Sequence, residues 1–221
     1  MNNKDKMVFI IDDDRSVRKS LTLYLNSAGF NVESFGSSEE YLLAKETPEG
    51  TGCLILDINL GGKTGLQLHE ELIKQDSHFP VIFITGKGDI HMSVLAMKRG
   101  AVNFLEKPFD DQELLRSIEE ALALSQTLLT GKEEHREAMK AISLLTPRET
   151  EILTHLMCGL LNKQIAFELN IAEHTVKLHR QSICKKLRVK SVPEILRIAG
   201  NAGIMPSIKK PYNAIGATDS V

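Results

Sequence analysis

The chain has 221 residues, of which 42% are hydrophobic and 25% charged, a composition ordinary for a globular protein. The net charge is only -2, but residues 1–130 contain 13 Lys and Arg against 20 Asp and Glu, whereas residues 131–221 contain 14 against 9. This asymmetry predicts an acidic module followed by a basic one, and the basic module is suited to a polyanion.

Three cysteines without paired spacing argue against a disulfide framework and against a zinc site, and they favour a reducing compartment. The apolar run near the N-terminus has about five residues, far fewer than a signal peptide or a membrane span needs. We therefore expect a cytoplasmic protein with no membrane partner.

Short apolar runs rich in β-branched residues alternate with amphipathic segments through the first half of the chain. Buried parallel strands have this length and composition. Strand–helix alternation of this kind predicts an α/β fold with a doubly wound, five-stranded parallel sheet, in which all strands end at one edge. The predicted strands are Val8–Ile11, Val32–Phe35, Leu54–Leu56, Val81–Ile84 and Val102–Leu105.

A polar segment and then a purely helical pattern follow the last strand–helix pair. At the start of the helical part, Thr146-Pro147-Arg148-Glu149 has the spacing of a capping box. Further helices are expected to begin at Asn162, at Glu173 and near Ser191. The expected parts are an α/β domain over 5–125, a helix extension and linker over 126–142, a helical domain over 143–201 and a flexible tail over 202–221.

Three carboxylates fall at predicted strand ends, with Asp12 and Asp13 after the first strand and Asp57 after the third. We expect these strands to be neighbours, so the carboxylates converge on the edge where such sheets bind ligands. Converging oxygen donors point to Mg²⁺ or another hard divalent cation. Thr85 and Lys107, after the fourth and fifth strands, add a hydroxyl and an ammonium. This set suits phosphoryl transfer to Asp57.

Each of these motifs also has an ordinary structural explanation when it is taken singly. The run Asp12–Asp14 can cap a helix, and Thr85-Gly86 can form a turn. Their expected convergence on one edge of the sheet is what favours the functional interpretation.

The segments VFIIDDD, LILDINLGGKTG, VIFITGKGD and FLEKPF resemble the signature blocks of a response-regulator receiver domain, and the resemblance covers residues 5–125. It implies that Asp57 is the phosphoacceptor. It also implies that Asp12, Asp13, Asp57 and the backbone carbonyl of Asn59 hold Mg²⁺.

The same resemblance assigns roles to residues of the last two strands. It makes Thr85 the switch hydroxyl, Lys107 the invariant lysine of the family, and Phe104 the aromatic rotamer switch. The Lys107–Pro108 peptide bond is expected to be cis. The block ITGKGD…AMKRGAVNFLEKPF is similar to the FixJ-like branch.

Two positions depart from the family pattern. Gly61 stands where a proline is usual, which predicts a looser loop after Asp57. Lys87 stands where FixJ-like chains often have a histidine, and a cation there is expected to alter the dephosphorylation rate.

Gly62-Lys63-Thr64 follows a predicted strand and opens a helix, as the end of a nucleotide-binding P-loop does. The full P-loop pattern also needs a glycine five residues before Gly62, and that position is Asp57. An NTPase is therefore the weaker alternative, and we expect no enzyme.

The helix expected over 173–187 has two distinct faces. At 100° per residue, Val176, Ile183 and Leu187 form a narrow buried stripe. The opposite face carries Lys177, Leu178, Gln181, Lys185 and Arg188. A solvated charged face would explain the lysines but not Leu178. A DNA recognition helix explains both, because Leu178 can meet a thymine methyl group there.

The expected DNA contacts divide into two groups. Lys177, Leu178 and Gln181 are expected to reach base edges in the major groove. Phosphate contacts are expected from Thr175, Arg180, Lys185, Asn162 and Lys163.

The segment LTPRETEIL…NKQIAFELNIAEHTVKLHRQSICKKLRVKS resembles a LuxR/NarL-type helix-turn-helix over residues 143–200. This resemblance implies that the residues matching Lys177, Leu178 and Gln181 face the groove. Ala172 stands where a serine cap is usual, which predicts a helix start weaker by about 1 kcal/mol. Gln181 stands where several relatives have a cation, so the base preference is expected to differ.

Together the two resemblances imply a two-component response regulator that acts as a transcription factor. The implied partners are a sensor histidine kinase, double-stranded DNA, a second copy of the chain on phosphorylation, and RNA polymerase. One alternative is an orphan regulator that binds DNA without phosphorylation. Another is redox sensing by Cys158 or Cys184, although the place of Cys184 beside the buried stripe favours packing.

Overall fold

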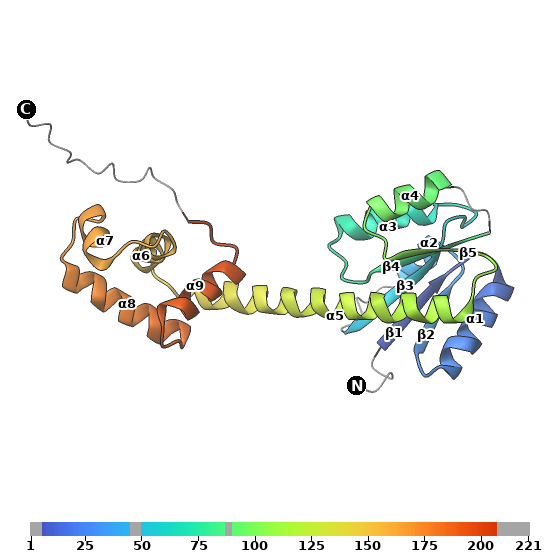
Figure 1. The fold of residues 1–221 in the computed structure, drawn as a ribbon, viewed down its shortest axis with the longest axis horizontal. Coiled ribbons are helices and arrows are strands. Elements are labelled where there is room, and N and C mark those ends of the chain that lie inside the picture. The colour runs from blue at the N-terminus through green and yellow to red at the C-terminus, as the bar shows by residue number, and fades with distance from the viewer. Residues whose placement is uncertain (1–5, 45–49, 87–89, 207–221) are drawn as a thin grey trace, which may run out of the picture. The chain divides into compact units, whose positions relative to one another are not determined.

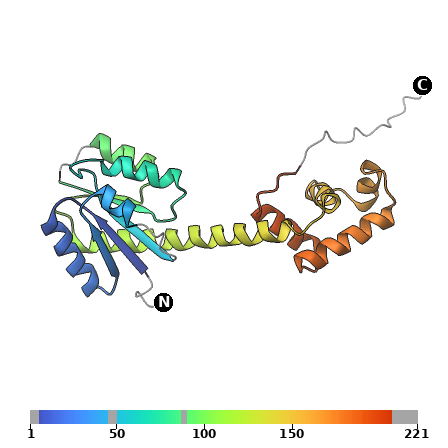
Figure 2. The same ribbon diagram turned by 180° about the vertical axis from the view of Figure 1, so that it is seen from behind.

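A computed structural model of the chain describes residues 6–44, 50–86 and 90–206. The chain divides into two compact units between Gly131 and Lys132. Figure 1 shows both units, and Figure 2 shows them from behind.

The first unit is built on a sheet that is parallel throughout. In the described part of the chain this sheet has five strands in the order β2-β1-β3-β4-β5. Each predicted apolar run overlaps one strand, which confirms the doubly wound fold. The strands are β1 (Lys6–Ile11), β2 (Asn31–Phe35), β3 (Thr51–Asp57), β4 (Val81–Thr85) and β5 (Asn103–Glu106).

Helices cover both faces of the sheet, as Figures 1 and 2 show. Phe9, Leu56 and Phe83 belong to the core beneath α2, α3 and α4, whereas Val8 and Ile55 belong to the core beneath α1 and α5. Strands buried on both faces have the nearly continuous apolar sequences seen here. The helices are α1 (Arg15–Ser27), α2 (Ser38–Leu43), α3 (Gly65–Lys74), α4 (Ile90–Lys98) and α5 (Asp111–Ile142).

The helix α5 is longer than its polar sequence suggested. The segment 126–142, expected to be a helix extension and linker, is helical throughout, since α5 continues to Ile142. Gly131 costs about 1 kcal/mol in a helix interior, too little to end a helix without a capping motif. The last turns also gain burial, because Ala138 is buried and Ile142 packs against the core of the second unit.

The second unit is helical, as predicted. The capping box is present, because Thr146 and Glu149 bond each other's backbone amides. Cys184 is half-buried against the core of this unit, which supports packing as its role. The helices are α6 (Pro147–Met157), α7 (Asn162–Glu168), α8 (Glu173–Leu187) and α9 (Val192–Asn201).

Two expectations fall partly or wholly beyond these ranges. The predicted tail lies outside the described residues from position 207 onward, and Lys87 also lies outside them. Across the described ranges, none of the helices combines the length and apolar character needed to cross a bilayer.

Candidate functional site

Three carboxylates meet at the C-terminal edge of the sheet. Asp12 follows β1 and Asp57 ends β3, and these strands are neighbours in the sheet. The side chains of Asp12 and Asp57 are buried, whereas Asp13 is exposed. One oxygen from each of these three residues lies within 4.8 Å of the others. The sheet topology therefore brings together the carboxylates that the sequence placed far apart.

Lys107 joins this cluster from the end of β5. Its Nζ lies 2.6 Å from Oδ2 of Asp12 and 2.6 Å from Oδ2 of Asp57. Its backbone N–H donates to the carbonyl of Thr85 at 2.7 Å. The Lys107–Pro108 bond is cis, as the resemblance implied. The ammonium group thus forms ion pairs with both buried carboxylates.

Burial and charge shift the acid–base behaviour of the cluster. Burial raises the pKa of Asp12 above its ordinary value, although the hydrogen bond from Lys107 opposes the shift. Burial also disfavours the charged form of Lys107, but its hydrogen bonds to Asp12 and Asp57 outweigh that cost and raise the pKa of Lys107. Lys107 therefore carries its positive charge at neutral pH.

The donor set of this cluster fits a hard divalent cation. Asp12, Asp13 and Asp57 offer carboxylate oxygens, the ligands that Mg²⁺ takes in proteins, and this three-residue group includes no nitrogen or sulfur donor. Asn59 lies beside the cluster, since its backbone N–H donates to Oδ1 of Asp57 at 3.0 Å. A metal at this place is consistent with the arrangement of the carboxylates.

The two expected switch residues come from neighbouring strands. Thr85 is buried at the end of β4, and Phe104 on β5 is half-buried. Phe104 pairs in register with Phe83, which is two residues before Thr85. Because successive strand residues alternate between faces, Thr85 and Phe104 lie on the same face of the sheet.

The loop after Asp57 is better anchored than its glycines suggested. Gly61 adopts a positive φ of 66°, which glycine tolerates and proline cannot adopt. Lys63 forms an ion pair with Glu71, and its carbonyl accepts from Ser38 Oγ at 3.3 Å. The predicted loosening is offset by these contacts, and the pairing of Lys63 gives no support to a P-loop.

Two further residues shape the site, and the sequence analysis considered only one of them, Asp14, as part of a run that can cap a helix. Asp14 caps α1, because its Oδ1 accepts from the backbone of Ser16 at 2.7 Å. A Cβ at Gly65, the first residue of α3, would lie 2.2 Å from the carbonyl oxygen of Asp57. Gly65 therefore lets α3 begin directly against the backbone of the acidic cluster.

The helix α8 has the two faces that its sequence predicted. Its buried residues are Val176, Ile183 and Leu187. Leu178 is 51% exposed. The other residues of the predicted outer face are also exposed, namely Lys177, Gln181, Lys185 and Arg188. Ala172 is the N-cap of α8 and provides no side-chain hydrogen bond.

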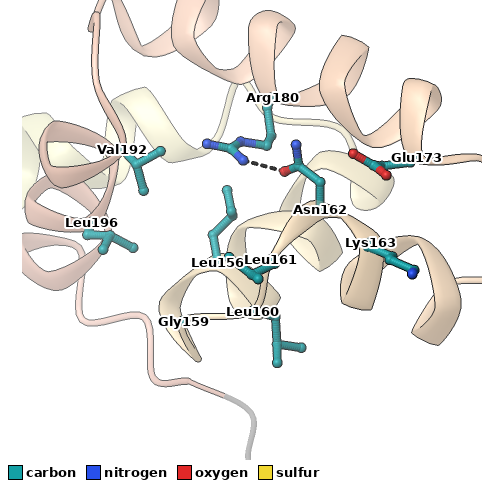
Figure 3. Close-up of a pocket in the computed structure, with 10 residues that line it drawn as sticks. All are labelled: Leu156, Gly159, Leu160, Leu161, Asn162, Lys163, Glu173, Arg180, Val192 and Leu196. Atoms are coloured by element: carbon teal, nitrogen blue, oxygen red, sulfur yellow. Dashed lines mark hydrogen bonds between the residues drawn. The ribbon is translucent and has the colours of Figure 1, made fainter.

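Two of the residues expected to bind phosphates contact each other. Arg180 Nη1 donates a hydrogen bond to Asn162 Oδ1, which links α8 to the first residue of α7 (Figure 3). Both residues line a hollow of about 530 Å³, which Lys163 and the apolar side chains of Leu161 and Leu196 also line. Thr175 at the start of α8 is half-buried.

A buried charged network beneath α8 was missed by the sequence analysis, which assigned Glu149 only a capping role. Glu149 is 3% exposed, and its carboxylate accepts from Ser182 Oγ at 2.7 Å and from Lys186 Nζ at 2.7 Å. Burial opposes its charged form, but the hydrogen bonds prevail and lower the pKa of Glu149 to about 2. This network ties the start of α6 to α8.

Comparison with known proteins agrees with this two-part architecture. Residues 8–119 match the response regulator receiver domain, and residues 143–199 match the bacterial regulatory proteins of the luxR family. The chain belongs to the response regulators, in the group that carries a LuxR-type DNA-binding domain.

Among curated relatives, nodulation protein W of Bradyrhizobium diazoefficiens is 43% identical over 90% of this chain and 87% of that protein. The transcriptional regulatory protein FixJ of Azorhizobium caulinodans is 38% identical over 90% of this chain and 94% of that protein. This similarity over nearly the whole length shows that the chain is a two-component response regulator that regulates transcription.

Solved structures give the same result. The response regulator StyR matches with a TM-score of 0.75 and 43% identity over 89% of this chain and 98% of that one. Full-length FixJ from B. japonicum matches with a TM-score of 0.55 and 35% identity over 91% of this chain and 99% of that one.

Proposed function

We propose that Asp57 accepts a phosphoryl group from a sensor histidine kinase and that this modification controls DNA binding. The observation that carries the proposal is the pairing of Asp57 with Lys107 beside two further carboxylates. In the transfer, a carboxylate oxygen of Asp57 forms a bond to phosphorus while the bond from phosphorus to the histidine nitrogen of the kinase breaks. The kinase histidine leaves as the free side chain.

Asp12, Asp13, Asp57 and the carbonyl of Asn59 would hold Mg²⁺ in this proposal. When bound, Mg²⁺ supplies positive charge that offsets the negative charge of the phosphoryl group. Lys107 contributes a second positive charge at the same place, because its ammonium group already contacts Asp57. An acyl phosphate carries about two negative charges, so both cations favour the modified state.

The switch in this proposal uses Thr85 and Phe104. The Thr85 hydroxyl donates a hydrogen bond to the new phosphoryl oxygen, and Phe104 moves with it because the two residues lie on one face of the sheet. Their movement reshapes the surface formed by α4 and β5. The reshaped surface favours a receiver homodimer and releases the DNA-binding domain.

The output in this proposal is the insertion of α8 into the major groove of double-stranded DNA. Lys177, Leu178 and Gln181 contact base edges. The phosphate contacts come from Thr175, Arg180, Lys185, Asn162 and Lys163. Dimers bind repeated half-sites in the cytoplasm and act on RNA polymerase, and the chain catalyses no reaction of its own on other substrates.

Mass spectrometry tests the first step directly. Wild type and Asp57→Ala are incubated with acetyl phosphate and Mg²⁺, and the intact mass is measured. We expect wild type to gain one phosphoryl group and Asp57→Ala to gain none. A wild type that remains unmodified would contradict the proposal and favour an orphan regulator that binds DNA without phosphorylation.

A further inference from the structure

The side chain of Arg18 reaches back from α1 to the loop that carries the acidic residues. Its Nη1 donates to the backbone carbonyl of Asp12 at 2.7 Å and to that of Asp13 at 3.1 Å. Arg18 is half-buried, and it lies one helical turn after the N-cap Asp14. A single guanidinium group thus joins two consecutive peptide units of the candidate metal site.

The two carboxylates of this loop are held in different ways. The side chain of Asp12 is fixed directly, because it accepts from Lys107 Nζ at 2.6 Å and from the backbone N–H of Asp14 at 2.8 Å. Within the described residues, no hydrogen bond holds the exposed carboxylate of Asp13. The direction of the Asp13 side chain therefore depends on the conformation of its backbone, which is what Arg18 contacts.

We propose that Arg18 is a positioning residue for the metal site. It holds the peptide units of Asp12 and Asp13 in the orientation that brings the Asp13 carboxylate beside Asp57. Groups that orient metal ligands without touching the metal contribute strongly to metal affinity. This inference rests on the proposed function, since it concerns the metal that phosphorylation of Asp57 requires.

The positive charge of Arg18, considered alone, would lower the affinity for Mg²⁺, whereas a positioning role would raise it. The effect of removing Arg18 therefore distinguishes the two roles. A cation near the site repels Mg²⁺, so a purely electrostatic role predicts tighter Mg²⁺ binding when Arg18 is replaced by a neutral residue. A positioning role predicts weaker binding. A merely structural role lowers the free energy of unfolding but leaves the Mg²⁺ affinity of the folded protein unchanged.

The experiment is a calorimetric titration of the full chain with Mg²⁺ alone, because the protein has no tryptophan to report binding by fluorescence. The variants are Arg18→Met, which removes both charge and donors, and Arg18→Gln, which keeps an amide donor. Arg15→Met is the matched control, since Arg15 is exposed in the same turn of α1. Urea unfolding of each variant reports any structural effect separately.

We expect Arg18→Met to raise the dissociation constant for Mg²⁺ roughly tenfold, with Arg18→Gln intermediate and Arg15→Met close to wild type. If Arg18→Met does not fold, Arg18→Gln decides the matter. Mg²⁺ binding by the folded variant that is as tight as in wild type, or tighter, overturns the role of Arg18.

The failure of this inference is distinguishable from failure of the proposed function. If wild type binds Mg²⁺ and accepts a phosphoryl group while Arg18→Met binds Mg²⁺ equally well, only the role of Arg18 is wrong. If wild type neither binds Mg²⁺ nor accepts a phosphoryl group, the proposed function is wrong and the role of Arg18 is wrong with it.

Discussion

The ammonium group of Lys107 lies 2.6 Å from Oδ2 of Asp57, although 50 residues separate the two in the chain. The same group contacts the fully buried Asp12. Lys107 therefore offsets part of the negative charge of carboxylates that would otherwise repel each other at the edge of the sheet.

Replacing Lys107 with methionine should destabilise the protein most when no divalent cation is present. Removal of one partner from a buried ion pair typically costs about 3 kcal/mol or more. A bound Mg²⁺ would replace part of the lost positive charge, so the loss should be smaller in Mg²⁺ than in EDTA. Urea unfolding in both conditions measures this difference. If Lys107→Met loses the same unfolding free energy in Mg²⁺ as in EDTA, that result would contradict a cation site at these carboxylates.

Replacing Gly65 with alanine should disturb the site through the backbone of Asp57. The added Cβ would lie 2.2 Å from the Asp57 carbonyl oxygen, so the start of α3 must shift. Such overpacking costs about 1–3 kcal/mol. We expect lower stability in urea and slower phosphorylation by acetyl phosphate. Gly62→Ala is the control, because an added Cβ there meets nothing within 4 Å. If Gly65→Ala and Gly62→Ala have the same stability and the same phosphorylation rate, the contact between position 65 and the Asp57 backbone does not shape the site.

Replacing Glu149 with glutamine should destabilise the DNA-binding domain and remove part of its acid sensitivity. The pKa of Glu149 is lowered from 4.5 to about 2 in the folded protein. A lowered pKa adds stability at pH values above the ordinary pKa, and this stability is lost as the pH falls through the window from 4.5 to about 2. Above that window the variant should be less stable by about 2 kcal/mol.

Urea unfolding at a series of pH values measures this effect. The difference between wild type and Glu149→Gln should shrink as the pH falls toward 2, the folded-state pKa. Glu151→Gln is the matched control, because Glu151 is exposed and pairs with Arg148. This substitution should lower the free energy of unfolding by less than about 1 kcal/mol. If the difference in unfolding free energy between wild type and Glu149→Gln does not change with pH, Glu149 is not ionised in the folded protein.

Replacing Leu178 with alanine should weaken DNA binding without lowering stability. Leu178 is 51% exposed on α8, whereas Val176 is fully buried two residues earlier. Loss of an apolar contact to a base should cost about 1 kcal/mol of binding free energy. Val176→Ala should instead lower the unfolding free energy by about 2 kcal/mol. Fluorescence anisotropy with labelled DNA and thermal unfolding together distinguish the two variants.

The sequence predicted the features that repeat along the chain. Alternation of short apolar runs and helices was enough to predict the parallel sheet, and the sheet in turn explains why Asp12 and Asp57 meet. The two faces of α8 were likewise predictable, because the 3.6-residue period separates Val176 from Leu178.

The sequence did not predict features that depend on particular side-chain contacts. The role of Arg18 follows from the tendency of helical side chains to point toward the helix N-terminus, a direction that leads to the acidic loop. The pairing of Glu149 with Lys186 joins residues 37 positions apart, and no local pattern indicates it. The continuation of α5 past Gly131 depends on the burial of its last turns.

Control of DNA binding by phosphorylation of Asp57 is tested most directly by the DNA affinity of the protein with and without that modification. Binding of the full-length protein to its target DNA is measured by fluorescence anisotropy, with and without acetyl phosphate in the presence of Mg²⁺. We expect the phosphoryl donor to strengthen DNA binding by wild type and to leave DNA binding by Asp57→Ala unchanged. Equal affinity for wild type and Asp57→Ala under both conditions would contradict a phosphorylation-controlled switch.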